Sequence, residues 1–124
     1  MTDRPIDEKT LEGLASSFGG GAEGWAFVRE LLDTFLEETP SQLATLRDAV
    51  ERDEADHARR VAHTLKTHGA TFGAGPFTDV CRELEMAGTR GVLDGATAGL
   101  VEQAALEWER ASVALERVGP EGTR

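Results

Sequence analysis

Apolar residues recur every three or four positions along four long stretches of this 124-residue chain. The longest stretch, residues 22–52, keeps that spacing throughout if Thr39 is counted as a member of the series. Such spacing places one side chain per turn on the same face of an α-helix, where it can be buried. The chain also contains no tyrosine and few strand-favouring clusters. The pattern therefore predicts an all-α fold without a sheet.

Capping residues and glycine-rich breaks divide the chain into five predicted helices. Their ranges are 7–17, 22–52, 54–72, 76–87 and 94–118. Asp7 and Asp53 are candidate N-caps of the first and third helices. The four longer helices are joined by short loops, which predicts an antiparallel up-down-up-down four-helix bundle with the short N-terminal helix over one end. We expect one domain over residues 7–118, with flexible tails at 1–6 and 119–124.

Pro40 leaves two interpretations of the longest segment open. The phase of the apolar spacing continues past Pro40, which favours one helix kinked near that residue. The alternative is a true break, with Thr39 capping a new helix whose first residue is Pro40. In either case the apolar stripes of the bundle predict six large buried residues. These are Trp25, Phe35, Leu65, Phe72, Leu84 and Trp108.

Charge and composition exclude several classes of function. The formal net charge of −10 argues against a nucleic-acid or anionic membrane surface as partner. No apolar run approaches the length of a membrane span, so we expect a cytoplasmic protein. Cys81 is the only cysteine, which excludes an intrachain disulfide and a cysteine-based zinc site. Neither a glycine-rich phosphate loop nor a cluster of carboxylates around His63 is present, so no cofactor of its own is expected.

The stretch 62–73 contains the candidate reactive group. Its inward-facing set is spaced by alternating steps of four and three residues and consists of Ala58, Ala62, Leu65, Gly69 and Phe72. His63 lies about 100° around the helix from Ala62, and thus outside the core, with Lys66 and Thr67 one turn away on the same face. His57 and His68 fall on other sides, which disfavours a histidine metal site. An exposed imidazole beside a cation is suited to nucleophilic chemistry near neutral pH.

These residues resemble the signature of the histidine-containing phosphotransfer (HPt) domain. Ala62, His63, Leu65, Lys66 and Gly73 match the family pattern, and Phe72 stands where leucine is usual. The flanking stretches 35–40 and 81–85 resemble the neighbouring helices of such domains. Thr67 replaces the usual glycine and His68 the usual serine or alanine. Because Thr67 is bulkier than glycine, we expect a narrower range of partners.

The resemblance implies a phosphorelay carrier. His63 would accept a phosphoryl group on Nε2, and Glu85 on the fourth helix would orient the ring. Lys66 would place positive charge near the phosphoryl oxygens, and Thr67 and Ala70 would lie on the docking face. The expected partners are a response-regulator receiver domain, which would supply the aspartate and its magnesium ion, and a histidine kinase.

We expect a monomer without ATP-binding or kinase activity of its own. Two alternatives stay open. The chain could be an HPt-like module that docks receiver domains or kinases without accepting phosphate, or a helical domain of unrelated function.

Overall fold

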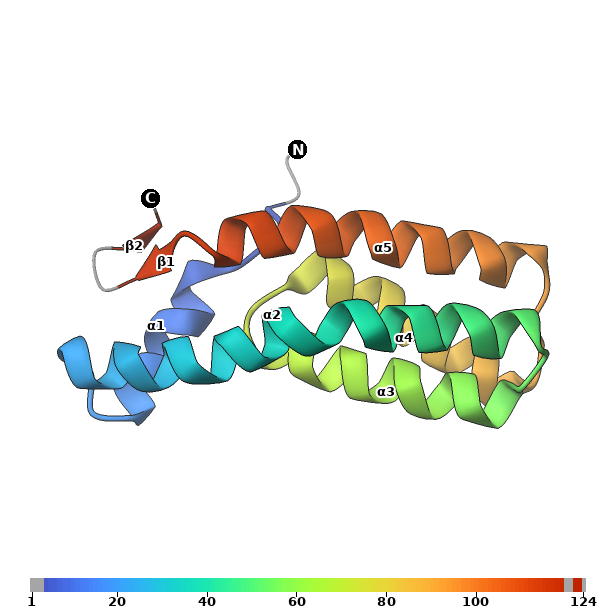
Figure 1. Cartoon of the computed structure of the whole chain (residues 1–124), viewed down its shortest axis with the longest axis horizontal. Coiled ribbons are helices and arrows are strands. Elements are labelled where there is room, and N and C mark those ends of the chain that lie inside the picture. The colour runs from blue at the N-terminus through green and yellow to red at the C-terminus, as the bar shows by residue number, and fades with distance from the viewer. Residues whose placement is uncertain (1–3, 120–121, 124) are drawn as a thin grey trace.

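The computed structural model describes residues 4–119 and 122–123 and is almost entirely helical (Figure 1). The elements in this part of the chain are α1 (Glu8–Ser17), α2 (Gly21–Glu51), α3 (Ala55–Thr71), α4 (Gly75–Arg90), α5 (Gly95–Leu115), β1 (Val118–Gly119) and β2 (Gly122–Thr123). The predicted all-α class is confirmed. One detail differs, because β1 and β2 form a two-residue antiparallel pair where no strand was expected. Val118 is buried and holds β1 against the bundle.

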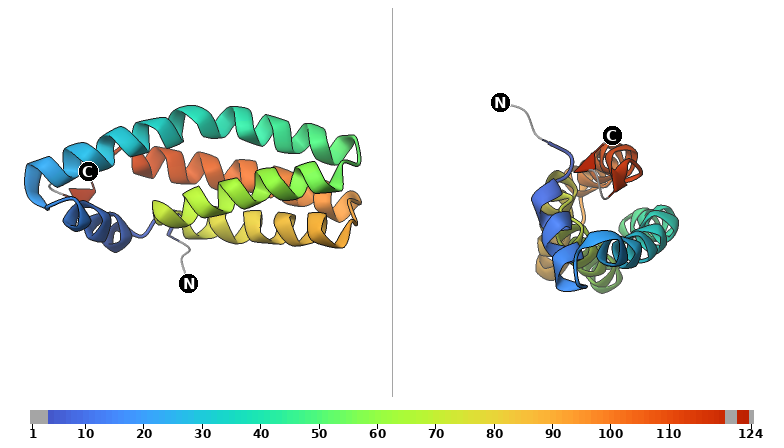
Figure 2. Two further views of the ribbon diagram at one scale, coloured as in Figure 1. Left: turned by 90° about the horizontal axis from the view of Figure 1, so that it is seen from below. Right: turned by 90° about the vertical axis from the view of Figure 1, so that its left-hand side faces the viewer.

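The four long helices run alternately up and down, and each packs against its neighbours in the order α2, α3, α4, α5 and back to α2 (Figure 2). Helix α1 packs against the N-terminal part of α2, at the end of the bundle where β1 and β2 also lie (Figure 1). The predicted antiparallel four-helix bundle with a short extra helix is therefore confirmed. No helix among the described residues is long and apolar enough to cross a membrane.

Helix α2 continues without interruption through Pro40. Proline has no N–H and so cannot donate to the carbonyl one turn earlier. The preceding residue, Thr39, is fully buried, and its hydroxyl group donates to the Phe35 carbonyl at 2.7 Å. This side-chain bond supports the backbone beside the proline, and burial of Phe35 and Leu43 on either side keeps both halves on the core. The single-helix interpretation was correct.

An aromatic layer fills the space between the helices and joins three of them. Phe35 on α2 stacks on Phe72 at 4.8 Å between ring centroids and meets Trp108 of α5 edge-on at 4.9 Å. Trp108 also lies 5.5 Å from Phe77 of α4. Edge-on and offset contacts of this kind stabilise a core beyond the burial of area alone. Of the residues predicted to be buried, Phe35, Leu65, Phe72, Leu84 and Trp108 are so.

Trp25 departs from the prediction, because it is only partly buried. The N-terminal part of α2 extends beyond the other long helices, and the described elements that flank it there are α1 and the C-terminal strands (Figure 1). Trp25 and Val118 consequently line a cavity of about 260 Å³ instead of meeting a fourth helix. The apolar spacing placed Trp25 on the correct face but did not show where the neighbouring helices end.

The N-cap of α3 and the ends of α4 and α5 also differ from the predicted ones. The last helix was predicted to reach Val118 but ends at Leu115, and Val118 belongs to β1. Asp53 is not the N-cap of α3: it adopts a left-handed conformation with φ of 58°, and Glu54 occupies the N-cap position. Helix α4 was predicted to end before Gly88 but continues to Arg90 and ends at Gly91, whose φ is 75°. Gly91 has the left-handed conformation that commonly terminates a helix, whereas Gly88 is needed for packing inside the helix.

The described residues just before α1 lie against the bundle. Residues 1–3 lie outside the described part of the chain, but Ile6 is buried in the core. The amide of Asp7 donates to the Gly73 carbonyl at 2.7 Å, which fastens this segment to the loop between α3 and α4. As predicted, the Asp7 side chain caps α1 by accepting from the amide of Lys9.

Candidate functional site

Helices α3 and α4 approach each other closely because glycines stand at both ends of their contact. A Cβ atom on Gly69 would lie 2.4 Å from the Thr78 hydroxyl oxygen, and one on Gly88 would lie 2.8 Å from the Ala55 carbonyl oxygen. Both distances are shorter than those that Cβ atoms make with non-bonded neighbours in real proteins. Only glycine fits at these two positions, and the short separation between the helices allows a side chain of α4 to reach the exposed face of α3.

His63 lies on that exposed face, as predicted. Its side chain is 57% exposed, whereas its sequence neighbours Ala62 and Leu65 are fully buried. The helix period accounts for this contrast, since Ala62 and Leu65 point into the bundle and His63 lies to one side. An imidazole in this position can be reached by a large reactant without any change in the fold.

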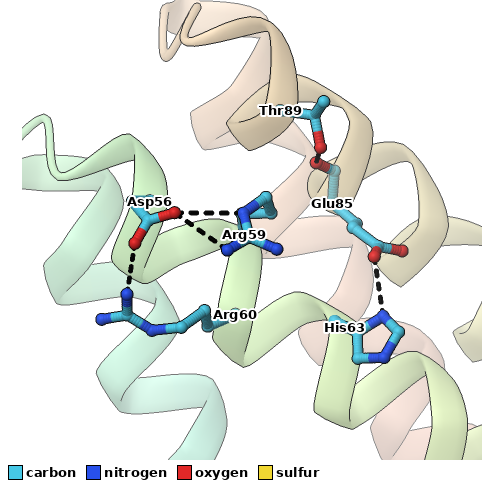
Figure 3. A network of polar contacts seen from close by, with 6 residues as sticks. All are labelled: Asp56, Arg59, Arg60, His63, Glu85 and Thr89. Atoms are coloured by element: carbon cyan, nitrogen blue, oxygen red, sulfur yellow. Dashed lines mark hydrogen bonds and ion pairs between the residues drawn. The ribbon is translucent and has the colours of Figure 1, made fainter.

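Glu85 of α4 binds the His63 ring on one side (Figure 3). Its Oε2 atom lies 2.7 Å from His63 Nδ1, and it is the ring's one hydrogen-bond partner among the described residues. An ionised carboxylate only accepts hydrogen bonds, so Nδ1 carries the proton. In the neutral ring, the lone pair is then on Nε2, which points away from Glu85 in Figure 3. The contact thus fixes both the orientation and the tautomer of the ring.

Lys66 binds the other oxygen of the same carboxylate. Its Nζ atom lies 2.6 Å from Glu85 Oε1, and the Glu85 side chain is 18% exposed. The Lys66 ammonium group is the main reason why the pKa of Glu85 is lowered; desolvation opposes the shift, and the His63 ring adds to it. Glu85 is therefore ionised at neutral pH and accepts from both groups. In the unmodified protein the Lys66 charge is directed at Glu85.

The two residues predicted for the docking face, Thr67 and Ala70, are exposed on the same helix. Beside them runs a groove of about 270 Å³ between α2 and α3, whose lining includes Leu31, Phe35 and Thr71. The sequence indicated that the second helix would border this face, but it did not show the groove.

The other histidines lie apart from His63. His68 is partly buried, with its ring 6.3 Å from Phe35 in an edge-on contact. His57 lies 3.4 Å from Glu54 at the start of α3. Within residues 4–119 and 122–123, no group of three or more histidine, cysteine or acidic side chains is placed to hold a metal ion.

One charged cluster near the site was missed by the sequence analysis. Asp56 accepts hydrogen bonds from Arg59 Nε and Nη2 at 3.1 and 2.9 Å, and it also pairs with Arg60 (Figure 3). The arginines precede His63 by four and three residues, a spacing that places them next to it on the helix surface. That spacing was visible in the sequence, but the shared carboxylate was not recognised.

Comparison with known proteins found a family model and a solved structure that each match most of this chain. The family model described as Hpt domain matches residues 30–117. Among solved structures, the crystal structure of histidine-containing phosphotransfer protein B (HptB) from Pseudomonas aeruginosa PAO1 is similar, with a TM-score of 0.81 and 25% sequence identity. The match covers 93% of this chain and 94% of that one. A search of curated proteins found no match. The family match covers most of the chain, including α3, α4 and the site between them, and the chain belongs to the Hpt domain family.

Proposed function

We propose that His63 is the phosphoacceptor of this domain and exchanges a phosphoryl group with the aspartate of a response-regulator receiver domain. Membership of the Hpt family supports a histidine phosphotransfer role in phosphorelays. The observation that carries the assignment to His63 is the 2.7 Å contact between its Nδ1 and Glu85, on a ring that is otherwise exposed. It leaves Nε2 as the nucleophile.

The proposed transfer exchanges one bond for another. The Nε2 lone pair attacks phosphorus as the bond between phosphorus and the aspartyl oxygen breaks, and the bonding electrons stay on the aspartate carboxylate. Positive charge develops on the imidazole ring during this step. Glu85 accepts from Nδ1 throughout and stabilises that charge, as a preoriented carboxylate does for histidine in other enzymes. The reverse step returns the phosphoryl group to an aspartate.

Lys66 has two roles in this proposal. Before transfer, it keeps Glu85 ionised and holds the carboxylate in place through the 2.6 Å contact. After transfer, its ammonium group lies one turn from the phosphoryl group and adds positive charge there. The chain's contribution is to orient the nucleophile and stabilise charge. The magnesium ion that assists phosphoryl transfer would be held by the receiver domain.

The receiver domain would dock on the exposed face of α3 and on the groove beside it. Thr67 and Ala70 present small side chains next to His63, so a partner can approach the ring closely. Leu31, which is 42% exposed, adds apolar surface on α2. Burial of such surface would supply affinity, while the charges around it would set the choice of partner and the encounter rate.

Incubation with a receiver domain phosphorylated on its aspartate tests the proposal. We expect label to appear on this chain in an acid-labile, alkali-stable form, which is the behaviour of phosphohistidine. His63→Gln should abolish the label while leaving helicity and melting nearly unchanged, since an exposed side chain contributes little to stability. His57→Gln is the matched control and should keep full labelling.

Two results would reject parts of this assignment. Labelling that persists in His63→Gln would remove His63 as the acceptor. Receiver binding without any transfer to the parent protein would favour the alternative, a docking module that is not phosphorylated.

A further inference from the structure

Positive charge on this acidic protein is concentrated on α3. This helix carries Arg59, Arg60 and Lys66 against a single carboxylate, Asp56. Helix α2, by contrast, carries seven carboxylates and two arginines. The reactive histidine therefore lies on the one helix whose charged side chains sum to a positive value, among the five helices of the described chain.

The charge next to His63 is already partly neutralised. Lys66 and Glu85 form an ion pair at 2.6 Å, so together they add no net charge. Asp56, however, is shared by two guanidinium groups and can neutralise only one of them. One positive charge in excess thus remains on the turn preceding His63. A phosphoryl group on Nε2 would bring a charge near −2 to this surface at neutral pH.

The two arginines are held differently. Arg59 donates to Asp56 from both Nε and Nη2, its side chain is 39% exposed, and its Cα and Cβ atoms pack under Gly88 of α4. Arg60 pairs with Asp56 through one nitrogen, Nη1, and is 61% exposed. In Figure 3 its guanidinium group points away from His63. Arg60 is consequently the freer of the two, and Arg59 alone can satisfy Asp56.

We propose that Arg60 is a phosphoryl-binding residue, which in the unmodified protein is paired with Asp56. When His63 carries a phosphoryl group, the Arg60 guanidinium leaves Asp56 and donates to the phosphoryl oxygens, while Arg59 remains on Asp56. This inference rests on the proposed modification of His63. Arginine is suited to the role because its planar guanidinium can donate two parallel hydrogen bonds to a phosphoryl group.

Phosphorus NMR of the phosphorylated protein tests this contact directly. The parent and an Arg60→Ala variant are phosphorylated with phosphoramidate, a small donor that needs no partner protein, and the second ionisation of the phosphoryl group is followed by its chemical shift. A nearby cation favours the dianion and lowers that pKa. We expect the pKa to rise by a few tenths of a unit in Arg60→Ala, the size of effect typical of an exposed ion pair.

Arg110→Ala is the matched control. Arg110 forms an ion pair with Glu107 at 2.8 Å on α5, the helix diagonally across the bundle from α3, and its loss changes the net charge equally. Arg110→Ala should leave the phosphoryl pKa unchanged. Asp56→Asn should lower it, because both arginines are then released. The phosphotransfer equilibrium with a receiver domain should move about two- to five-fold away from His63 in Arg60→Ala, and not in Arg110→Ala.

The outcomes separate this inference from the proposed function. If Arg60→Ala and Arg110→Ala give the same phosphoryl pKa as the parent, Arg60 does not bind the phosphoryl group, even if receiver domains exchange phosphate with His63. If the phosphoryl pKa responds to Arg60→Ala but no receiver domain transfers phosphate, the contact is real and the proposed partner is wrong. Arg60→Lys should restore part of the shift, which a purely structural role would not predict.

Discussion

The bundle contains two helix interfaces built on opposite principles. Between α3 and α4, Gly69 and Gly88 remove side chains altogether and bring the two backbones together. Across the middle of the bundle, Phe35 and Trp108 keep α2 and α5 apart by the width of aromatic rings. The first interface gives up buried apolar area and places a carboxylate within 2.7 Å of His63. The second buries two large aromatic side chains. Large side chains provide stability here, and small ones provide the geometry of the site.

The strongest test of this division is removal of a large aromatic side chain. Trp108→Ala should lower the free energy of unfolding by about 3–5 kcal/mol, because it leaves a cavity among rings that cannot fully collapse. Phosphotransfer measured well below the melting temperature should stay close to that of the parent, since α3 and α4 keep their contact. Urea denaturation gives the first quantity and receiver-dependent labelling the second. Loss of transfer in a variant that is still folded would show that the two interfaces are coupled.

A substitution at the glycine interface should lower stability less than Trp108→Ala does, and it should affect phosphotransfer more. Gly88→Ala places a Cβ atom 2.8 Å from the Ala55 carbonyl oxygen, so the helices must shift apart. We expect a loss of about 1–3 kcal/mol in stability, as for other overpacked sites. Transfer should also slow, because Glu85 moves away from His63.

Gly99→Ala on α5 is the matched control for Gly88→Ala. It lies in a helix like Gly88, but an added Cβ atom would meet nothing within 4 Å. Alanine is the better helix former, so this variant should gain about 0.5–1 kcal/mol in stability and transfer normally. Equal effects of the two substitutions would contradict the close-packing argument for Gly88.

Gly88 and Gly91 show how much of the fold the sequence alone could predict. Apolar spacing predicted the number, order and direction of the helices, and it placed His63 outside the core. It treated Gly88 as a helix end, because a glycine that terminates a helix and a glycine that admits a neighbouring helix are the same residue. Gly91, with φ of 75°, is the terminator, and Gly88 is the packing site. The difference depends on the distance to α3, which no local pattern contains.

Contacts between side chains show the same limit: those within one helix can be predicted from the sequence, and those between two helices cannot. Glu85 was a candidate for orienting the ring only through the family resemblance, and the fold brings its carboxylate to the ring. The contact of Lys66 with Glu85 was not predicted, since the charge was assigned to the phosphoryl group alone. Partners on one helix follow from spacing, as for Asp56 and Arg60. Partners on two helices require the crossing geometry of those helices, which depends on the tertiary packing.

Glu85→Gln should lower the stability of the folded protein moderately, by an amount that depends on pH. The pKa of Glu85 is lowered from its ordinary value of 4.5, so its ionic contacts stabilise the folded state at higher pH, and this contribution is lost as the pH falls through the lowered pKa. The parent should therefore be more stable than Glu85→Gln at pH 7, by less than about 1 kcal/mol because the pair is partly solvated. The difference should shrink in acid.

Transfer by Glu85→Gln provides the second measurement. Glutamine can still accept from His63 Nδ1 but does not carry the charge that stabilises an imidazole becoming positive, so transfer should slow more than receiver binding weakens. Glu83→Gln, which changes an exposed carboxylate two residues away on α4, is the control. A stability difference that stays constant between pH 3 and pH 7 would rule out the ionic role of Glu85.

The smallest expected effect on stability concerns Thr67, which is exposed one turn from His63. Thr67→Gly introduces the residue usual in the resembling family and should cost well under about 1 kcal/mol in stability, because threonine is itself a modest helix former. If the threonine side chain limits how closely a receiver backbone approaches the ring, this variant should keep transfer to its present partners and extend it to others. Thr67→Trp should block receiver binding without unfolding the bundle. Affinity and transfer rate, measured separately against several receiver domains, decide the matter. If Thr67→Trp binds and transfers like the parent, the receiver docks on another face and the small residues around His63 have no role in recognition.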